Sequence, residues 1–457
     1  MKLQFLGGTG TVTGSKFYLH DKRHSWLVEC GLFQGLKELR ERNWRPLPFN
    51  VADLDAIILT HAHVDHSGYL PVVVRDGFQG PVFASEPTVE LCKILLPDAG
   101  YVQEEDARYA AKSGFSKHHP PKPLYTYQDA VNSLSTLLSL SDDHKHGIGK
   151  GVNLTFKRAG HILGARFVII EFTKMFRTFR ILFTGDIGRY DSLMVVDPAD
   201  VGDVDYIVLE STYGNREHEE EDVLTRFENI IKDTIAKNGK VIIPAFAVGR
   251  TQDILYILYL LELEGRLPDV PIFLNSPLAI DATEIYVRFM HEHKFYSDDQ
   301  SSIARFRPSN LRIVHNIEDS KRLNSLDGPA IILSSAGMMT GGRILHHLKA
   351  YLPDENSTLI ITGFQAQGTR GRLIKEGAKA VKIHGIPIAI RCNVEVINSL
   401  SAHGDRDDIL KWLSHFKKAP KEVFLVHGEA ETSKIFGDEI EKKFKWKVSV
   451  PGYGDEV

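Results

Sequence analysis

The chain has 457 residues, of which 43% are hydrophobic and 25% charged, and this composition argues against a disordered, fibrous or membrane-embedded protein. Its 55 Lys and Arg residues stand against 59 Asp and Glu residues, so the formal net charge is -4. Binding to nucleic acid would therefore need a local basic channel or bound metal ions, because the molecule as a whole does not attract phosphate. A chain of this length predicts two or three folded units.

The cysteines Cys30, Cys92 and Cys392 are far apart and form no C-x-x-C pair. This spacing predicts buried thiols in a reducing compartment, and it disfavours both disulfides and a cysteine-ligated zinc site. The first residues reach glycine before any apolar stretch long enough for a signal peptide. The apolar run at 254–261 is far shorter than a membrane span. We therefore expect a soluble, cytoplasmic protein with no membrane partner.

Short apolar runs separated by glycine predict strands in the first half of the chain. They lie at residues 3–6, 16–19, 26–28, 56–59, 82–84, 154–156, 167–172, 180–183 and 206–209. Apolar residues at helical spacing predict a helix over 87–112, with a loop at 118–123 after it. This order favours a β-sandwich over an alternating βα array.

The strand predicted at 56–59 leads directly into the segment T-H-A-H-V-D-H-S-G, which contains His61, His63, Asp65 and His66. An irregular loop here can direct His61 and His63 to one side and Asp65 and His66 to another, as two adjacent metal ions would require. Without metal, burying these groups together would be costly in desolvation and repulsion. The absence of cysteine favours zinc or another divalent ion that binds imidazole over an iron–sulfur cluster.

This H-x-H-x-D-H motif after a strand resembles the signature of the metallo-β-lactamase superfamily. Glu29 in L-V-E-C-G, His161 in A-G-H-I-L-G and Asp186 in F-T-G-D fall in the order that this superfamily leads us to expect. Each of them alone would more often be a structural residue, and the order is what makes them site candidates. Glu29 stands where the family usually has aspartate, so we expect this residue behind the ligands to tune activity without abolishing it.

After about residue 215 the predicted elements alternate between helix and strand. Helices are predicted at 223–237, 252–264 and 282–293, and strands at 240–245, 271–274, 312–314, 330–333 and 358–362. The strands are short continuous apolar runs, which is typical of a parallel sheet buried on both faces. From about residue 394, strands at 395–397 and 422–426 and a helix at 432–444 predict a return to the first domain.

Three later motifs resemble those that the β-CASP nucleases add to the metallo-β-lactamase fold. They contain Glu210 in L-E-S-T-Y-G, His403 in S-A-H-G-D and His427 in V-H-G-E. The resemblance covers nearly the whole chain and extends to prokaryotic relatives of the eukaryotic pre-mRNA 3′-end cleavage endonuclease. Histidine at the third motif is similar to the RNA-processing branch, because the DNA-repair branch typically has valine there.

The resemblance implies an α/β fold in two parts. An αββα metallo-β-lactamase sandwich would comprise residues 1–211 and a return segment, 391–457. A doubly wound parallel α/β insert, the β-CASP domain, would occupy residues 212–390.

The resemblance also implies seven ligands for two Zn²⁺ ions per chain. One ion would be held by His61, His63 and His161, the other by Asp65, His66 and His427, with Asp186 shared between them. A hydroxide held between the ions would be the nucleophile, with Asp65 orienting it. His403 would act as the general acid, with Glu210 bonded to its other ring nitrogen.

Three glycine-rich, arginine-bearing loops of the insert resemble the substrate loops of the family. Their candidate substrate-binding residues are Arg250, Gly341, Arg343, Thr369, Arg370 and Arg372. The loops follow predicted strands and precede predicted helices, where backbone N–H groups face an anion and open α/β sheets bind ligands. Guanidinium groups there suit single-stranded RNA, although ordinary turns with exposed arginines have the same pattern.

The favoured interpretation is a zinc-dependent ribonuclease that acts on single-stranded RNA in processing or decay. Two alternatives remain: a metallo-hydrolase for a small thioester, lactone or β-lactam, and a non-catalytic scaffold of an RNA-processing complex. The sequence leaves open the balance of endonuclease and 5′-to-3′ exonuclease activity and the sequence preference. A homodimer is suggested by the resemblance alone.

Overall fold

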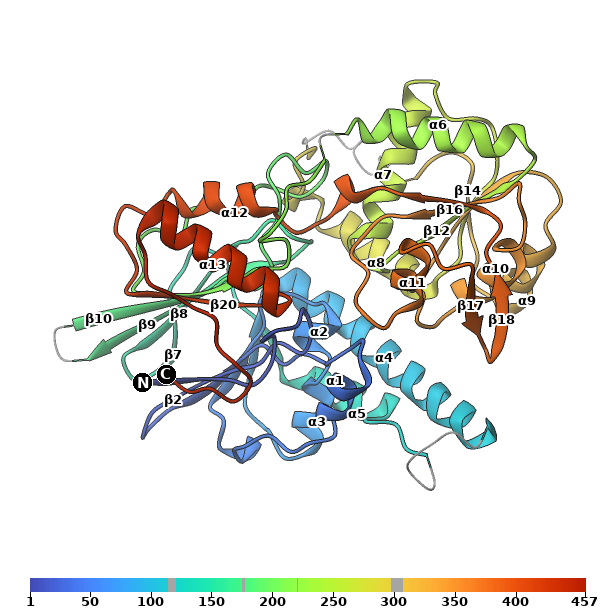
Figure 1. Ribbon diagram of the computed structural model, residues 1–457. Coiled ribbons are helices and arrows are strands. Elements are labelled where there is room, and N and C mark those ends of the chain that lie inside the picture. Colours follow the sequence, from blue (N-terminus) through green and yellow to red (C-terminus); the bar gives the residue numbers. More distant parts are fainter. Residues whose placement is uncertain (114–120, 175–176, 220, 297–306) are drawn as a thin grey trace. The chain divides into compact units, whose positions relative to one another are not determined.

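The computed structural model describes residues 1–113, 121–174, 177–219, 221–296 and 307–457, so the first half of the predicted loop at 118–123 lies outside the described residues. The chain forms two compact units, one comprising residues 1–217 and 403–457 and the other residues 218–402 (Figure 1). The borders predicted for the insert, at 212 and 390, both fall earlier in the chain than the borders of the second unit.

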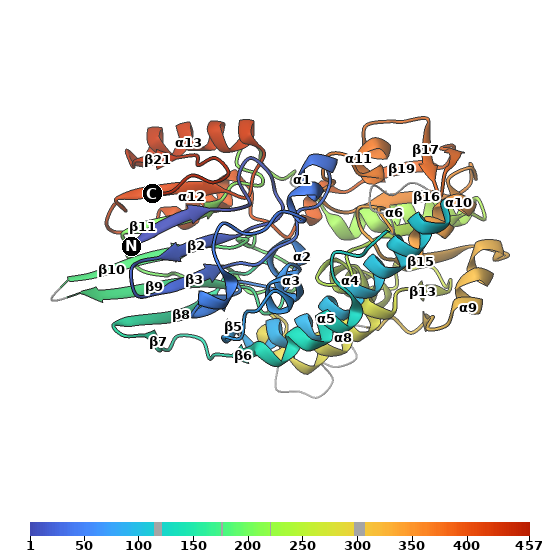
Figure 2. The ribbon, with the colours of Figure 1, turned by 90° about the horizontal axis from the view of Figure 1, so that it is seen from below.

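Two sheets form the centre of the first unit (Figure 2). The order of the first sheet is β1 (Lys2–Phe5), β2 (Phe17–His20), β3 (Ser25–Val28), β4 (Ala56–Ile58), β5 (Val82–Ala84) and β6 (Leu137–Ser139). The order of the second sheet is β21 (Val448–Ser449), β20 (Glu422–Val426), β11 (Tyr206–Glu210), β10 (Arg177–Phe183), β9 (Arg166–Lys174), β8 (Val152–Arg158) and β7 (His146–Gly149). Alternate side chains of both sheets, such as Phe5 and Ile58 from one and Phe156 and Phe183 from the other, meet in one apolar core.

Helices cover the outer faces of both sheets. On the side of the first sheet lie α1 (Lys37–Arg42), α2 (Val64–Ser67), α3 (Leu70–Arg75), α4 (Glu86–Ser113) and α5 (Tyr127–Ser133). On the side of the second lie α12 (Arg406–Leu413) and α13 (Ala430–Phe444), with α13 packed on β20 and β21. This layering confirms the predicted αββα sandwich, and α4 confirms the helix predicted over 87–112.

The second unit is built on a parallel sheet with helices on both faces. Its strands, in spatial order, are β14 (Leu311–Ile313), β13 (Ile272–Leu274), β15 (Ala330–Ser334), β12 (Lys240–Pro244), β16 (Thr358–Ile361) and β19 (Asn393–Val396). Its helices are α6 (Val223–Ala236), α7 (Arg250–Leu263), α8 (Pro277–Arg288), α9 (Ile317–Arg322), α10 (Ile344–Tyr351) and α11 (Arg370–Lys375). A separate hairpin joins β17 (Ala380–Ile383) to β18 (Ile386–Ala389).

The central strands of this sheet, β13, β15, β12 and β16, are almost continuously apolar because both of their faces are buried. Val241 and Ile243 of β12 belong to the core that contains residues of α6 and α7, whereas Ile242 belongs to the core that contains residues of α10. This arrangement confirms the doubly wound parallel insert that the continuous apolar runs predict.

The strand predicted at 395–397 does not return to the first unit. It is β19, and its residues pair in parallel with β16 at the edge of the second unit's sheet. The chain returns to the first unit later, with the loop that carries His403. A short strand pattern does not specify which sheet the strand joins, so this border could not be predicted from the sequence.

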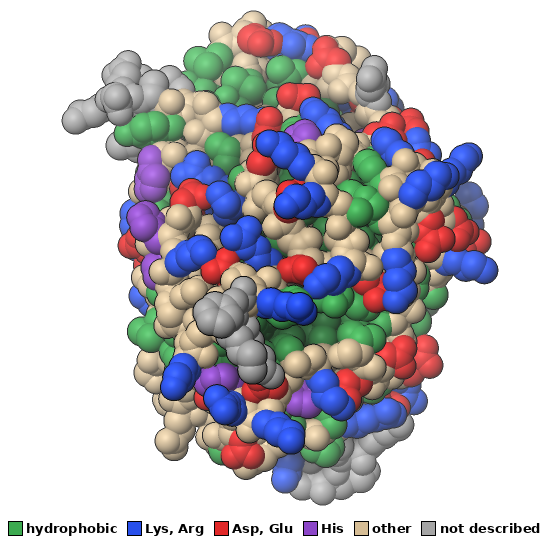
Figure 3. Space-filling model, turned by 90° about the vertical axis from the view of Figure 1, so that its left-hand side faces the viewer, with side chains coloured by type: hydrophobic (Ala, Val, Ile, Leu, Met, Phe, Trp, Pro, Cys, Tyr) green, Lys and Arg blue, Asp and Glu red, His purple; other side chains and the backbone are tan. Residues whose placement is uncertain are grey.

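The cysteines are all free and buried, as predicted. None of the described helices combines the length and the apolar character that crossing a membrane needs. On the face of the molecule in Figure 3, basic and acidic side chains are interspersed, in keeping with the nearly balanced charge of the chain.

Candidate metal centre

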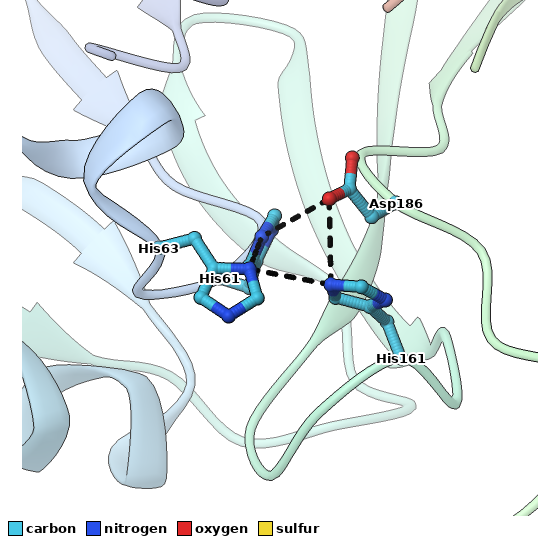
Figure 4. A group of neighbouring side chains, drawn as sticks. All are labelled: His61, His63, His161 and Asp186. Carbon is cyan, nitrogen blue, oxygen red and sulfur yellow. Dashed lines mark hydrogen bonds and ion pairs between the residues drawn. The ribbon is translucent and has the colours of Figure 1, made fainter. Parts of the chain in front are cut away.

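The first group of predicted ligands converges at one edge of the first unit (Figure 4). His61 and His63 follow β4, His161 follows β8, and Asp186 follows β10. Strands β8 and β10 both pair antiparallel with β9, so their carboxyl ends lie at the same edge of the sheet. His63 Nδ1 lies 3.1 Å from His61 Nε2 and 3.3 Å from His161 Nε2, and Asp186 Oδ2 lies 3.4 Å from both Nε2 atoms.

The second group consists of Asp65, His66 and His427. Asp65 and His66 lie on the short helix α2, whose N-cap is His63, and His427 follows β20. His427 Nε2 lies 3.3 Å from His66 Nε2 and 3.5 Å from Asp65 Oδ2. The residues of the H-x-H-x-D-H motif are therefore directed into two groups, as expected, but Asp65 and His66 lie on a helical turn and not in the irregular loop that the sequence predicts.

Asp186 contacts both groups with opposite oxygens. Its Oδ2 faces His61 and His161, while its Oδ1 lies 3.2 Å from His66 Nε2 and 3.3 Å from His427 Nδ1. Burial alone would raise the pKa of this carboxyl, but the surrounding histidines, His427 and His66 foremost, hold it well below its usual range. An ionised carboxylate between two sets of nitrogen donors is suited to bridge two cations.

The spacing of the donor atoms fits zinc. Ligands 2.0–2.1 Å from one tetrahedral zinc ion lie about 3.3 Å from each other, and four of the six pairs of donor atoms in the first group lie 3.1–3.4 Å apart. His61 is fully buried, and this burial, reinforced by the neighbouring His66, lowers its pKa well below the usual value. The ring is therefore neutral and presents a lone pair, which is the form that binds a metal ion.

Two side chains, Glu29 and Thr60, lie behind the rings of the predicted ligands. The Glu29 carboxylate accepts a hydrogen bond from the Thr60 backbone N–H, and its Oε1 lies 3.4 Å from His66 Nδ1. Thr60 Oγ1 lies 3.0 Å from His61 Nδ1. Glu29 has a φ of 64°, the left-handed region that is uncommon for residues other than glycine. The structure thus places Glu29 behind a ligand ring, where a carboxylate orients metal-binding histidines.

His403 and Glu210 form a pair beside the Asp186 carboxylate. His403 Nδ1 lies 3.0 Å from Glu210 Oε2, and His403 Nε2 lies 3.9 Å from Asp186 Oδ2. Burial lowers the pKa of His403, but Glu210 and Asp186 outweigh this effect and raise it to about 9. At neutral pH the ring carries a proton on the nitrogen that faces the ligand groups.

The predicted substrate residues all lie in the second unit, at the carboxyl ends of its central strands. Arg370 donates to the carbonyl groups of Met339, Thr340 and Lys382, so it joins the glycine-rich loop after β15 to α11. The Gly371 N–H also bonds to the carbonyl of Met338, in the same loop. The structure therefore brings these two loops together.

The other predicted substrate side chains also have partners within the unit. Arg343 donates to Asn275 and to the carbonyl groups of Val314 and His315. Arg250 begins α7 and pairs with Asp253 at 2.9 Å.

The remaining three substrate candidates lie in the same two loops or directly after them. Thr369 is the N-cap of α11, where it accepts from the Arg372 N–H, and Arg372 pairs with Glu376. Gly341 has no atom within 4 Å of where a Cβ would lie.

Two threonines that contact predicted site residues, Thr60 and Thr212, were not predicted from the sequence. Thr212 Oγ1 lies 2.6 Å from Glu210 Oε2 and 3.0 Å from His427 Nδ1. The available signal was position, because each threonine lies one or two residues from a predicted site residue at the end of a strand.

Three family models match the chain. They are the metallo-beta-lactamase superfamily over residues 14–86, the Beta-Casp domain over 251–374 and the Zn-dependent metallo-hydrolase RNA specificity domain over 387–451.

The chain is similar along nearly its whole length to a ribonuclease and to transcription termination factors. Ribonuclease TTHA0252 of Thermus thermophilus is 35% identical, and the match covers 100% of both chains. Transcription termination factor FttA of Methanocaldococcus jannaschii is 28% identical, over 99% of this chain and 70% of that protein. FttA of Methanosarcina mazei is 30% identical, over 97% and 69%.

A crystal structure of a protein of unknown function from Enterococcus faecalis matches 100% of this chain and 99% of that chain. The TM-score is 0.51 and the sequence identity 13%, so this likeness shows the fold alone.

Proposed function

Because the chain belongs to the β-CASP family of metallo-β-lactamase-fold hydrolases and is a metal-dependent ribonuclease, we propose that it cleaves single-stranded RNA with two zinc ions. The proposed ligands are His61, His63 and His161 for one ion and Asp65, His66 and His427 for the other, with Asp186 shared. His403 is the proposed general acid.

The observation that carries this proposal is the position of Asp186. Its two oxygens lie 3.2–3.4 Å from histidine nitrogens of both ligand groups. One of these oxygens, Oδ2, also lies 3.9 Å from His403 Nε2. A proton donor thus lies directly beside the two groups of ligands, as hydrolysis of a phosphodiester requires.

Zinc, when bound, activates water at neutral pH and neutralises charge that develops on the phosphate. The side chains of this protein supply the rest. Asp65 accepts a hydrogen bond from, and so orients, the attacking water. His403 donates its Nε2 proton to the leaving 3′ oxygen, and Glu210 holds the ring in that orientation through Nδ1.

We propose that the loops of the second unit bind the RNA backbone. Arg372 and the backbone N–H groups near Gly341 are the groups best suited to meet phosphate directly. Arg343 and Arg370, whose guanidinium groups bind backbone carbonyls, would shape the same loops. Thr369 is the N-cap of α11, and Arg250 is the first residue of α7. The backbone N–H groups at the N-termini of α7 and α11 favour binding of an anion, in addition to the side chains.

The test uses an unstructured RNA labelled at either the 5′ or the 3′ end, with zinc-replete protein. We expect internal fragments from both labels, which indicates an endonuclease, with single nucleotides from the 5′ end if a 5′-to-3′ exonuclease activity is also present. The matched control is the double variant Asp65→Ala, His66→Ala, which should not cleave. A single-stranded DNA of the same sequence measures the preference for RNA.

Other outcomes would favour the alternative functions. Cleavage that the double variant retains would indicate a contaminating nuclease and would overturn the assignment of the centre. A zinc-replete protein that binds the RNA without cleaving it would favour a scaffold, and hydrolysis of a thioester or lactone in place of RNA would favour a small-substrate hydrolase.

Two further proposals concern the cellular location and the oligomeric state of the enzyme. A cytoplasmic location is supported by three cysteines that are all unpaired. A homodimer is a separate proposal, which light scattering on the purified chain would test.

A further inference from the structure

We propose that the Thr212 hydroxyl is a positioning group that links the ligand ring of His427 to the Glu210–His403 pair. The inference rests on the proposed function, because it assigns Thr212 a part in holding one zinc ligand and in aligning the general acid. Thr212 itself touches neither the RNA nor the reacting atoms.

The fold places Thr212 between these groups through the pairing of two strands. Strands β11 and β20 are parallel neighbours, and Glu210, the last residue of β11, lies opposite Val426, the last residue of β20. The residues that follow both strands therefore emerge side by side. The backbone N–H of Ser211 donates to the carbonyl of His427, which fixes the two turns to each other.

The distances from the Thr212 hydroxyl to its three neighbours indicate which of them accepts its single proton. Its oxygen lies 2.6 Å from Glu210 Oε2, 3.0 Å from His427 Nδ1 and 3.0 Å from the His427 carbonyl oxygen. The shortest of these contacts joins it to a carboxylate oxygen of Glu210, which is the strongest acceptor of the three. The hydroxyl therefore donates to Glu210, and its oxygen is left to accept a proton from the His427 ring.

This assignment fixes the tautomer of His427. Its Nε2 faces Asp65 and His66, whereas its Nδ1 faces Thr212 and lies 3.3 Å from Asp186 Oδ1. With the proton on Nδ1, the lone pair of Nε2 points toward the second ligand group. Metal-binding histidines commonly donate their other ring N–H to an oxygen in this way.

On its other side the hydroxyl fixes the carboxylate of Glu210. The Ile187 backbone N–H donates to Oε1, Thr212 donates to Oε2, and His403 Nδ1 lies 3.0 Å from Oε2. Glu210 is fully buried, so its orientation is set by these three donors and not by water. Loss of the Thr212 donor would free Oε2 to turn and would loosen His403.

The test compares Thr212→Val, which removes the hydroxyl at nearly constant volume, with Thr212→Ser, which keeps it. Ser211→Ala is the matched control, since Ser211 Oγ bonds to the Val426 carbonyl and to Ser433 in the same turn. Each protein is loaded with zinc, checked for folding by circular dichroism and thermal melting, and measured for zinc release to a chelator. Its kcat and KM for RNA cleavage are then determined.

We expect Thr212→Val to weaken retention of one zinc ion and to lower kcat, each by roughly 10- to 100-fold, with KM little changed. Thr212→Ser and Ser211→Ala should match the wild type in both respects. Loss of zinc retention or of kcat in Thr212→Ser would overturn the role of the hydroxyl even if Thr212→Val failed to fold.

A change in only one of the two measurements in Thr212→Val would overturn the link, because Thr212 would then support one side alone. Wild-type values in Thr212→Val would overturn the inference while leaving the proposed function intact. A wild-type protein that retains zinc but does not cleave RNA would overturn the proposed function, and the inference with it.

Discussion

Replacing Glu210 with glutamine should shift the alkaline limb of the pH–rate profile to lower pH. The pKa of His403 is raised from an ordinary value of 6.5 to about 9, with burial opposing the shift and Glu210 the foremost group that favours it. Asp186 and Asp65 also face the ring and raise its pKa. A difference of this size corresponds to about 3 kcal/mol in favour of the protonated ring.

The variant Glu210→Gln keeps the shape of the side chain and removes its charge. Loss of one close opposite charge lowers a pKa by about 1–3 units. A fall from about 9 to about 7.5 would reduce the protonated fraction at pH 8.5 from about three quarters to about one tenth, an approximately eightfold loss of rate, and would leave the fraction nearly unchanged at pH 6.

The assay is single-turnover cleavage of a labelled RNA between pH 6 and 10 at saturating zinc. The control is Asp408→Asn, because Asp408 lies on α12 and contacts the backbone near His403 without facing its ring. The reasoning would be refuted by an alkaline limb that stays in place in Glu210→Gln while the rate falls equally at every pH.

Three other substitutions test separate parts of the account. His403→Ala should keep both zinc ions and slow cleavage by roughly 100-fold or more, measured as metal content and single-turnover rate, since general acids contribute about 10²–10⁴-fold; loss of a zinc ion would make the general-acid assignment wrong. Asp186→Ala should lose metal and activity together, and full zinc content in this variant would exclude its role as the shared ligand. Lys16 is buried with Nζ 4.7 and 4.5 Å from the ring centres of Phe33 and Tyr69, and burial lowers its pKa from 10.5 to about 8. Since the unfolded chain binds more protons between these pH values, the wild type should gain stability relative to Lys16→Met by up to about 3 kcal/mol as the pH rises from 8 to 10.5. Urea unfolding of both proteins at the two pH values measures this gain, and an unchanged difference would mean that Lys16 titrates normally.

The cluster of His61, His63, Asp65 and His66 could be predicted from residue type and spacing, whereas His161, Asp186 and His427 were expected from the family resemblance. Three histidines and an aspartate within six residues, directly after a strand, have few uses other than metal binding, and the structure divides them between two groups around Asp186. The sandwich of the first unit followed from short apolar runs separated by glycine, and the parallel sheet of the second unit followed from continuous apolar runs that alternate with predicted helices.

The contacts of the neutral and basic side chains could not be predicted in this way. Threonine is common at strand ends, so its position two residues after Glu210 does not by itself distinguish Thr212, whose contacts depend on the pairing of β11 with β20. Arginine in a glycine-rich loop suggests an exposed phosphate contact, yet Arg343 and Arg370 bind carbonyl groups from segments distant in the sequence. The sheet that β19 joins could not be predicted either, because the tertiary fold sets which strands pair.

The most direct test of the central claim is to titrate zinc into metal-free protein and follow RNA cleavage per chain. We predict no cleavage without metal, a rise with added zinc and a plateau at two equivalents, with no rise in the Asp65→Ala, His66→Ala variant. Cleavage without metal, or a plateau at one equivalent, would contradict the proposed two-zinc centre.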